Sequence, residues 1–116
     1  MEFQIEKYPE EQVVCIRVPG RLTRENADAL IDLLKQFTES GEVRLVLDMS
    51  ATERIDSSGI GAIVSQIASL RSKQGDVRLA EVHTFVQEVL KITHLDKILQ
   101  IFSTCQEAIK SYGQKS

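Results

Sequence analysis

The feature that most constrains the fold is the alternation, along the chain, of short apolar runs rich in β-branched residues with longer stripes of helical spacing. Val13–Val18 is such a run, and it follows an alternating N-terminal segment and the turn residues Pro9–Glu11, which together predict a β-hairpin. Leu45–Leu47 is apolar throughout and predicts a strand covered on both faces, at the centre of a sheet. Val77–Ala80 predicts another strand, and Ile98–Phe102 a short last one.

Apolar residues at helical spacing fill the intervals between these runs. Over Arg24–Thr38 the spacing predicts a helix that starts at a Thr23 cap and ends at Ser40–Gly41. A second stripe extends over Ile60–Leu70 and predicts a helix between the central strand and the next one. A strand, a helix and a strand in this order imply a right-handed crossover between parallel strands.

Two capping boxes predict the remaining helices. Thr84 pairs with Gln87 at the start of one, and Thr104 pairs with Glu107 at the start of the other. The resulting order is β β α β α β α (β) α, an α/β fold with a mixed β-sheet that begins with an N-terminal hairpin, continues by parallel crossovers and has helices packed on it. No repeat or linker divides the chain, so we expect residues 1–116 to form a single domain.

The composition excludes several classes of function. Lys and Arg number 14 against 17 Asp and Glu, which gives a net charge of −3, and aromatic residues make up only 5%, so we expect no direct binding to nucleic acid. The longest uncharged stretch, Ser57–Leu70, is shorter than the roughly 20 apolar residues of a membrane-spanning helix, so we expect no membrane insertion. The N-terminus lacks the features of a signal peptide, which favours a cytoplasmic protein.

The sequence indicates neither a metal nor a cofactor. Cys15 and Cys105 stand far apart, outside any CxxC or Cys/His spacing, so we expect neither a zinc site nor a disulfide framework and favour a reducing compartment. The histidines and carboxylates lack metal-ligand spacing, and the chain has no Gly-rich phosphate loop of the Walker type.

The most informative polar segment is Asp56-Ser57-Ser58-Gly59, which lies between the loop after the central strand and the second helical stripe. Ser57 or Ser58 is suited to cap the helix, because a serine hydroxyl accepts a hydrogen bond from an unpaired backbone N–H of the first turn. A phosphate at this place would be favoured by about 0.3–1 kcal/mol through the helix dipole. Capping alone would also account for these four residues.

The side of this helix opposite its apolar stripe carries unusually small residues, where a solvated face ordinarily carries Lys and Glu. These residues are Gly61, Ala62, Ser65, Ser69 and Ser72. Small side chains predict a smooth docking surface, and Gly61 costs the helix about 0.5–1 kcal/mol relative to alanine, which close approach of another chain would explain. The alternative is that this face packs beneath the chain's own loops.

Over nearly its whole length the sequence resembles a STAS domain, the fold of the anti-sigma-factor antagonists. The matching segments are Val18–Leu22, Leu45–Asp48, Ile55–Gly61, Val89–Leu99, Ile101–Phe102 and Glu107–Ala108. The chain departs from the family at a few positions. His94 stands where members often have Gly, Val82–Thr84 where they often have a Pro or Ser, and Thr52 and Arg54 where they are often apolar.

This resemblance implies a partner switch, in which the unphosphorylated protein captures an anti-sigma factor that is also a serine kinase and thereby frees a sigma factor. In the family this kinase phosphorylates the serine directly after the aspartate, here Ser57, and a PP2C-type serine phosphatase resets the switch. On this interpretation Asp56 orients the acceptor hydroxyl or its loop, and Ser58 caps the helix. The expected partner-binding residues are Asp56, Ser57, Ser58, Gly59, Gly61, Ala62, Ser65 and Ser69. We expect a monomer or weak dimer.

Two other functions are compatible with parts of the sequence. An enzyme could use Ser57 as a nucleophile and His83 or His94 as a base, but the segment is not a Gly-x-Ser-x-Gly elbow and both histidines fall near loops or helix ends, so we expect no catalytic residues and no enzyme. A constitutive STAS subunit of a transporter or signalling complex would dock through the same helix without phosphorylation.

Overall fold

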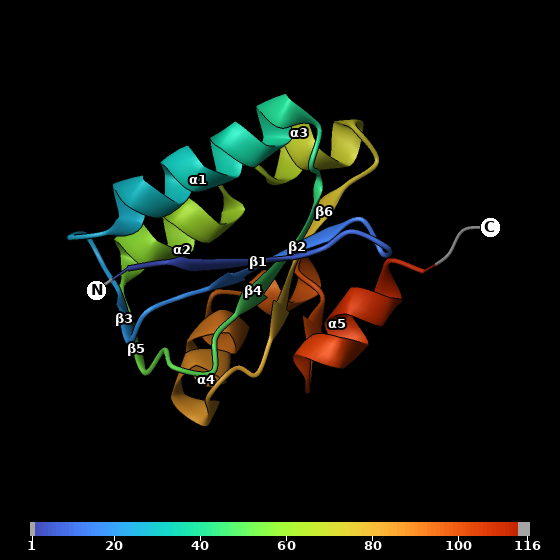
Figure 1. Cartoon of the computed structure of the whole chain (residues 1–116). Coiled ribbons are helices and arrows are strands. Elements are labelled where there is room, and N and C mark those ends of the chain that lie inside the picture. Colours follow the sequence, from blue (N-terminus) through green and yellow to red (C-terminus); the bar gives the residue numbers. More distant parts are fainter. Residues whose placement is uncertain (1, 114–116) are drawn as a thin grey trace.

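A five-stranded mixed sheet forms the centre of the computed structural model, which describes residues 2–113 (Figure 1). Its strands lie in the order β1-β2-β4-β6-β7. They comprise β1 (Gln4–Tyr8), β2 (Val13–Arg17), β4 (Arg44–Asp48), β6 (Asp76–Ala80) and β7 (Ile101–Phe102). β1 runs antiparallel to β2, and every other pairing in this sheet is parallel. The structure therefore confirms the N-terminal hairpin, the central position of β4 and the parallel crossovers.

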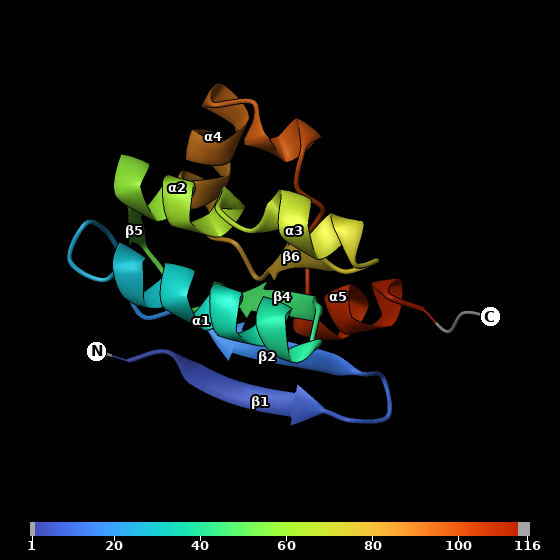
Figure 2. The same ribbon diagram turned by 90° about the horizontal axis from the view of Figure 1, so that it is seen from above.

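Helices cover both faces of the sheet. α1 (Ala27–Ser40), α2 (Ser57–Val64) and α3 (Ile67–Ser72) lie on one face, and α5 (Cys105–Ser111) lies on the other (Figures 1 and 2). α4 (Thr84–Ile92) packs near the short strand β5 and is followed by a single 3-10 turn at Leu95–Lys97. The helices of residues 2–113 are all too short or too polar to cross a membrane.

The two-sided core follows from the alternation of side chains along each strand. On β2, Val14 and Ile16 join the larger cluster beneath α1 and α2, whereas Val13 and Cys15 join a smaller cluster beneath α5. The neighbouring strand β4 divides its apolar side chains in the same way. Because both faces are covered, the central strands read as continuous apolar runs in the sequence.

The start of α1 differs from the sequence prediction, because the helix begins at Ala27 rather than at Arg24. The side chain of Asn26 accepts a hydrogen bond from the Thr23 N–H at 2.9 Å, while the carbonyl of Thr23 accepts from the N–H groups of Asn26 and Ala27. Residues 23–26 thus form a closed turn before the helix. The predicted end is confirmed, since Gly41 adopts a left-handed φ of 90°.

The second helical stripe is interrupted, so the prediction of one continuous helix is wrong. Ser65 ends α2, where its hydroxyl donates to the carbonyl of Ala62 at 2.8 Å and its N–H bonds to the same carbonyl at 3.2 Å. This local bonding competes with continuation of the helix, and α3 begins only at Ile67. A second, two-stranded parallel sheet also escaped prediction. It joins β3 (Arg21–Leu22) to β5 (Arg54–Ile55).

The two predicted capping boxes have different outcomes. Thr104 caps α5 by accepting a hydrogen bond from the N–H of Glu107 at 3.1 Å, as predicted. Thr84 is instead the first residue of α4, and the residue at the cap position is His83, whose side chain makes no capping bond. His94, which replaces the frequent family glycine, adopts a left-handed φ of 63° directly after α4.

Candidate functional site

The segment before α2 is held in place by the small second sheet. β3 and β5 pair in register at Leu22 and Ile55, so the chain reaches position 56 from a fixed direction. The carbonyl of Gly20 accepts from the N–H of Glu53 at 2.9 Å. Thr52, fully buried, donates its hydroxyl proton to the carbonyl of Pro19 at 2.8 Å. A polar residue at this position therefore anchors the loop.

Asp56 connects the start of α2 to the turn before α1. Its Oδ1 accepts a hydrogen bond from the N–H of Gly59 at 3.0 Å, and its Oδ2 accepts from the N–H of Arg24 at 3.1 Å. The bond from Gly59 is the main cause of a pKa of Asp56 below its ordinary value, and the bond from Arg24 adds to it. Asp56 is thus the helix cap, and the prediction that Ser57 or Ser58 fills this role is wrong.

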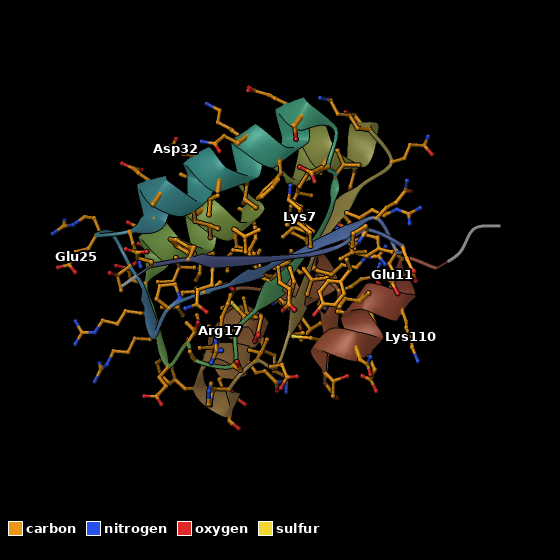
Figure 3. The ribbon with its side chains drawn as sticks, viewed as in Figure 1. Lys7, Glu11, Arg17, Glu25, Asp32 and Lys110 are labelled. Carbon is orange, nitrogen blue, oxygen red and sulfur yellow. The ribbon has the colours of Figure 1, made fainter. Side chains whose placement is uncertain are left out.

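Ser57 is exposed and is the first residue of α2. It borders a shallow, polar hollow of about 340 Å³ between α2 and the turn before α1. The hollow is lined by Arg21, Thr23, Arg24, Glu25, Asp56, Ser57 and Ser58. Glu25 projects from this end of the molecule in Figure 3. The hydroxyl of Ser57 is therefore accessible to a modifying enzyme, with charges of both signs nearby.

The other predicted partner-binding residues divide into exposed and buried groups. Gly61, Ser65 and Ser69 are exposed, and Ser58 is half-buried. Gly59 and Ala62 are buried, so the prediction that they contribute to an exposed docking surface is wrong.

Both buried residues serve packing within the chain. A side chain at position 59 would collide with the backbone oxygen of Leu22, so the close approach that this glycine permits is to β3. Ala62 belongs to the core cluster that contains Ala27 and Leu30 of α1, so its small size lets the two helices approach each other.

The turn before α1 contributes residues to the hollow that were not predicted. Arg21, Thr23 and Arg24 precede Ser57 by more than thirty positions, and the β3–β5 pairing and the contact with Asp56 help to bring them together. A sequence signal did exist, because Thr23 and Asn26 are spaced as a turn that closes before a helix.

The contacts of both histidines are structural, and neither histidine is placed as a catalytic base for Ser57. The Nε2 atom of His83 lies 2.7 Å from the carbonyl oxygen of Ser50, with which it shares a hydrogen bond. His94 lies in the turn between α4 and the 3-10 turn, where its N–H bonds to the carbonyl of Lys91.

A STAS domain is defined by this mixed sheet, by the order of its elements and by the serine that follows the capping aspartate at the start of α2. Residues 4–108 match the family model described as the STAS domain, and the chain belongs to this family. Its relatives include a candidate anti-sigma factor antagonist from Thermotoga neapolitana, 34% identical over 101 residues that cover 86% of this chain and 89% of that protein.

Other relatives extend this comparison. The crystal structure of a candidate anti-sigma factor antagonist from Thermotoga maritima gives a TM-score of 0.85 at 30% identity, and the match covers 95% of this chain and 93% of that one. The high affinity sulfate transporter 2 of Stylosanthes hamata is 31% identical over 130 residues, which cover 97% of this chain but only 20% of the transporter. The two Thermotoga proteins are named for regulation rather than for catalysis, in agreement with the expectation of a non-enzymatic protein.

Proposed function

We propose that this chain is a cytoplasmic anti-sigma factor antagonist that works by partner switching. Unphosphorylated, it binds an anti-sigma factor with serine kinase activity through the surface at the start of α2. Phosphorylation of Ser57 by that kinase releases it, and a PP2C-type phosphatase restores the binding form. The observation that carries the proposal is the exposed serine in the first turn of α2, directly after the capping aspartate, in a chain of this family.

The proposed docking surface consists of the exposed and half-buried members of the predicted set. It comprises Asp56, Ser57, Ser58, Gly61, Ser65 and Ser69. At Gly61 a side chain would contact nothing within 4 Å, so the backbone of α2 is open to a partner at this position. Among these residues only Asp56 carries a charge, which keeps the desolvation cost of docking low in the unphosphorylated state.

Phosphorylation changes this balance through charge. A phosphate on Ser57 adds about −1.5 to −2 charges beside Asp56. When the surface is buried against a partner, an unpaired dianion loses its water at an effective cost of several kcal/mol. A cost of about 4 kcal/mol converts a micromolar complex into a millimolar one, which amounts to release.

The anchoring of the site favours a switch by charge over a switch by shape. The buried Thr52 hydroxyl and the β3–β5 pairing hold the loop, and Asp56 already caps α2 before any phosphate is present. We therefore expect the backbone around Ser57 to remain in place after phosphorylation, while affinity for the partner falls.

The test is a binding assay with matched charge variants. Wild type, Ser57→Ala, Ser57→Asp and a form with phosphoserine at position 57 serve as baits in lysate of the native cell, and the partners are identified by mass spectrometry. Ser103→Asp is the control, because Ser103 is an exposed serine in the loop before α5, outside the docking surface.

The affinity of the purified partner for each bait then decides the proposal. We expect Ser57→Ala and Ser103→Asp to bind like wild type, and the phosphoserine form to bind about a thousandfold more weakly. Ser57→Asp carries one added charge and should give a smaller loss. Equal affinity of the wild-type and phosphoserine forms would disprove the partner switch.

The second candidate is a constitutive STAS subunit. It is favoured by one observation, namely that nearly the whole chain aligns with a fifth of a sulfate transporter. In this case the same baits would recover a transport or scaffold protein, and they would do so equally with and without the charge at Ser57.

A further inference from the structure

The two cysteines, far apart in the sequence, are neighbours in the fold. Cys15 lies on β2 and faces α5, in the same apolar cluster as Val46 and Ala80 of the adjacent strands. Cys105 is the first residue of α5 and packs against that cluster. Both residues therefore belong to one apolar layer between β2 and α5, where Cys105 lowers the pKa of Cys15 and Cys15 raises the pKa of Cys105. Both are free in the structure.

The helix that carries Cys105 is attached to the sheet at both ends. At its start, the N–H of Cys105 donates to Oε2 of Glu81 at 3.1 Å. At its end, the hydroxyl of Tyr112 donates to the carbonyl of Leu45 or of Asp76, at 2.6 and 2.9 Å respectively. These contacts hold α5, and with it Cys105, against the apolar cluster that contains Cys15.

The two thiols differ in access and are both poorly ionised. Cys15 is 6% exposed, whereas Cys105 is half-buried and reaches the surface. Burial raises the pKa of Cys15 to about 11 and also raises the pKa of Cys105, and nearby acidic groups add to the effect. The titratable groups that face the pair are Glu6, Tyr8, Asp48 and Glu81. At neutral pH both thiols are therefore mostly protonated and react slowly.

We propose that Cys15 and Cys105 form a reversible intrachain disulfide when the protein is exposed to a peroxide. Cys105, the more exposed of the two residues, loses its thiol proton and its thiolate attacks one peroxide oxygen; an S–O bond forms, the O–O bond breaks, and the expelled hydroxide takes up that proton and leaves as water. Cys15 then loses its thiol proton and its thiolate attacks the sulfenic sulfur; an S–S bond forms, the S–O bond breaks, and the expelled hydroxide takes up the second proton and leaves as water. The two sulfurs together lose two electrons, which reduce the peroxide.

The cross-link would act on stability without touching the docking surface. It would join β2 to α5 on the face of the sheet opposite α1 and α2, and it would close a loop that contains most of the chain. A disulfide that closes a long loop stabilises the folded state mainly by restricting the unfolded chain. The oxidised protein should therefore resist unfolding better and keep the affinity of the α2 surface for its partner.

The experiment exposes the purified wild-type chain to hydrogen peroxide and analyses it without reductant. We expect a mass lower by two hydrogen atoms, the loss of both free thiols, and a digest in which a β2 peptide is linked to an α5 peptide. Dithiothreitol should reverse all three changes. Because thiolate is the reactive form, the reaction should become about tenfold faster with each unit by which the pH rises, as long as the pH stays below the pKa of Cys105.

Cys15→Ser and Cys105→Ser are the matched controls, and neither should yield the linked peptide. The oxidised wild type should also show a higher urea midpoint than the reduced form, a difference absent from both variants. Wild-type chains that only gain oxygen, or that link to a second chain, would overturn the proposal. The measurement uses no partner, so its outcome is independent of the switch at Ser57.

Discussion

Replacing Gly59 by alanine tests how closely α2 sits on β3. A Cβ atom at this position would collide with the backbone oxygen of Leu22 and would lie 2.9 Å from Cγ of Leu22 and 3.0 Å from Cγ1 of Ile55. Carbon atoms prefer separations of about 3.5–4.0 Å. The backbone oxygen belongs to a paired strand, so α2 must move away from β3 to admit the methyl group. Gly61, two residues further on, has no neighbour within 4 Å and is the matched control.

The two substitutions should change stability in opposite directions. Overpacking of this kind costs about 1–3 kcal/mol, while alanine gains about 1 kcal/mol over glycine within a helix. For Gly59→Ala the gain is smaller near the helix start, so we expect a net loss of about 1–2 kcal/mol. For Gly61→Ala only the propensity gain applies, and we expect about 0.5–1 kcal/mol of added stability.

Urea unfolding, monitored by far-UV circular dichroism, measures both changes. Circular dichroism is the suitable signal because the chain has no Trp and therefore no tryptophan fluorescence. The shift of the midpoint at constant slope gives the change in free energy of unfolding. Equal stability of the two variants, or a loss only in Gly61→Ala, would refute the geometry assigned to the start of α2.

Three further predictions concern other polar contacts. Tyr112→Phe should lower the free energy of unfolding by about 1–3 kcal/mol, because it removes a hydroxyl that forms hydrogen bonds with the backbone of Leu45 and of Asp76. Urea unfolding measures this loss. His94→Gly should raise the melting temperature, since a left-handed φ costs a non-glycine residue about 1 kcal/mol, and calorimetry would detect the change. The pKa of Asp56 lies below its ordinary value, so the carboxylate stabilises the fold above the unfolded pKa and loses that effect as the pH falls through the folded pKa. In acid titrations, Asp56→Asn should therefore lose less stability than wild type as the pH falls below the unfolded pKa of about 4.

The strands were predictable because their apolar patterns are local. Val13–Val18 and Leu45–Leu47 carry enough β-branched and apolar residues to identify a hairpin strand and a central strand without any tertiary information. β3 and β5 contain two residues each and have no pattern of their own. They form because the tertiary structure brings two distant segments of the chain side by side, and the sequence of neither segment indicates this.

The helix starts were harder to predict because capping residues compete. Thr23 and Asn26 are both good caps, and the turn between them places the start of α1 after Asn26. At α2 the sequence predicted Ser57 or Ser58 as the cap, but Asp56 fills this role, and its second oxygen also binds the turn before α1. A contact between segments so distant in sequence cannot be read from the order of three polar residues.

The small residues at and after the start of α2 predicted a docking surface or, as the alternative, a face packed beneath the chain's own loops. Ala62 instead packs with the chain's own helix α1, whereas Gly61 and Ser65 face outward. Helical spacing alone could not separate these cases, because α2 is covered both by the sheet and by a second helix.

The position of α5 has a consequence for synthesis of the protein on the ribosome. The apolar face formed by β2, β4 and β6 can be completed once Ala80 has left the ribosome, whereas its cover, Ala108 and Ile109, leaves later. In that interval the nascent chain presents a bare apolar sheet surface, and such surfaces aggregate readily. This surface is of the kind that chaperones recognise during translation, and it disappears when α5 docks.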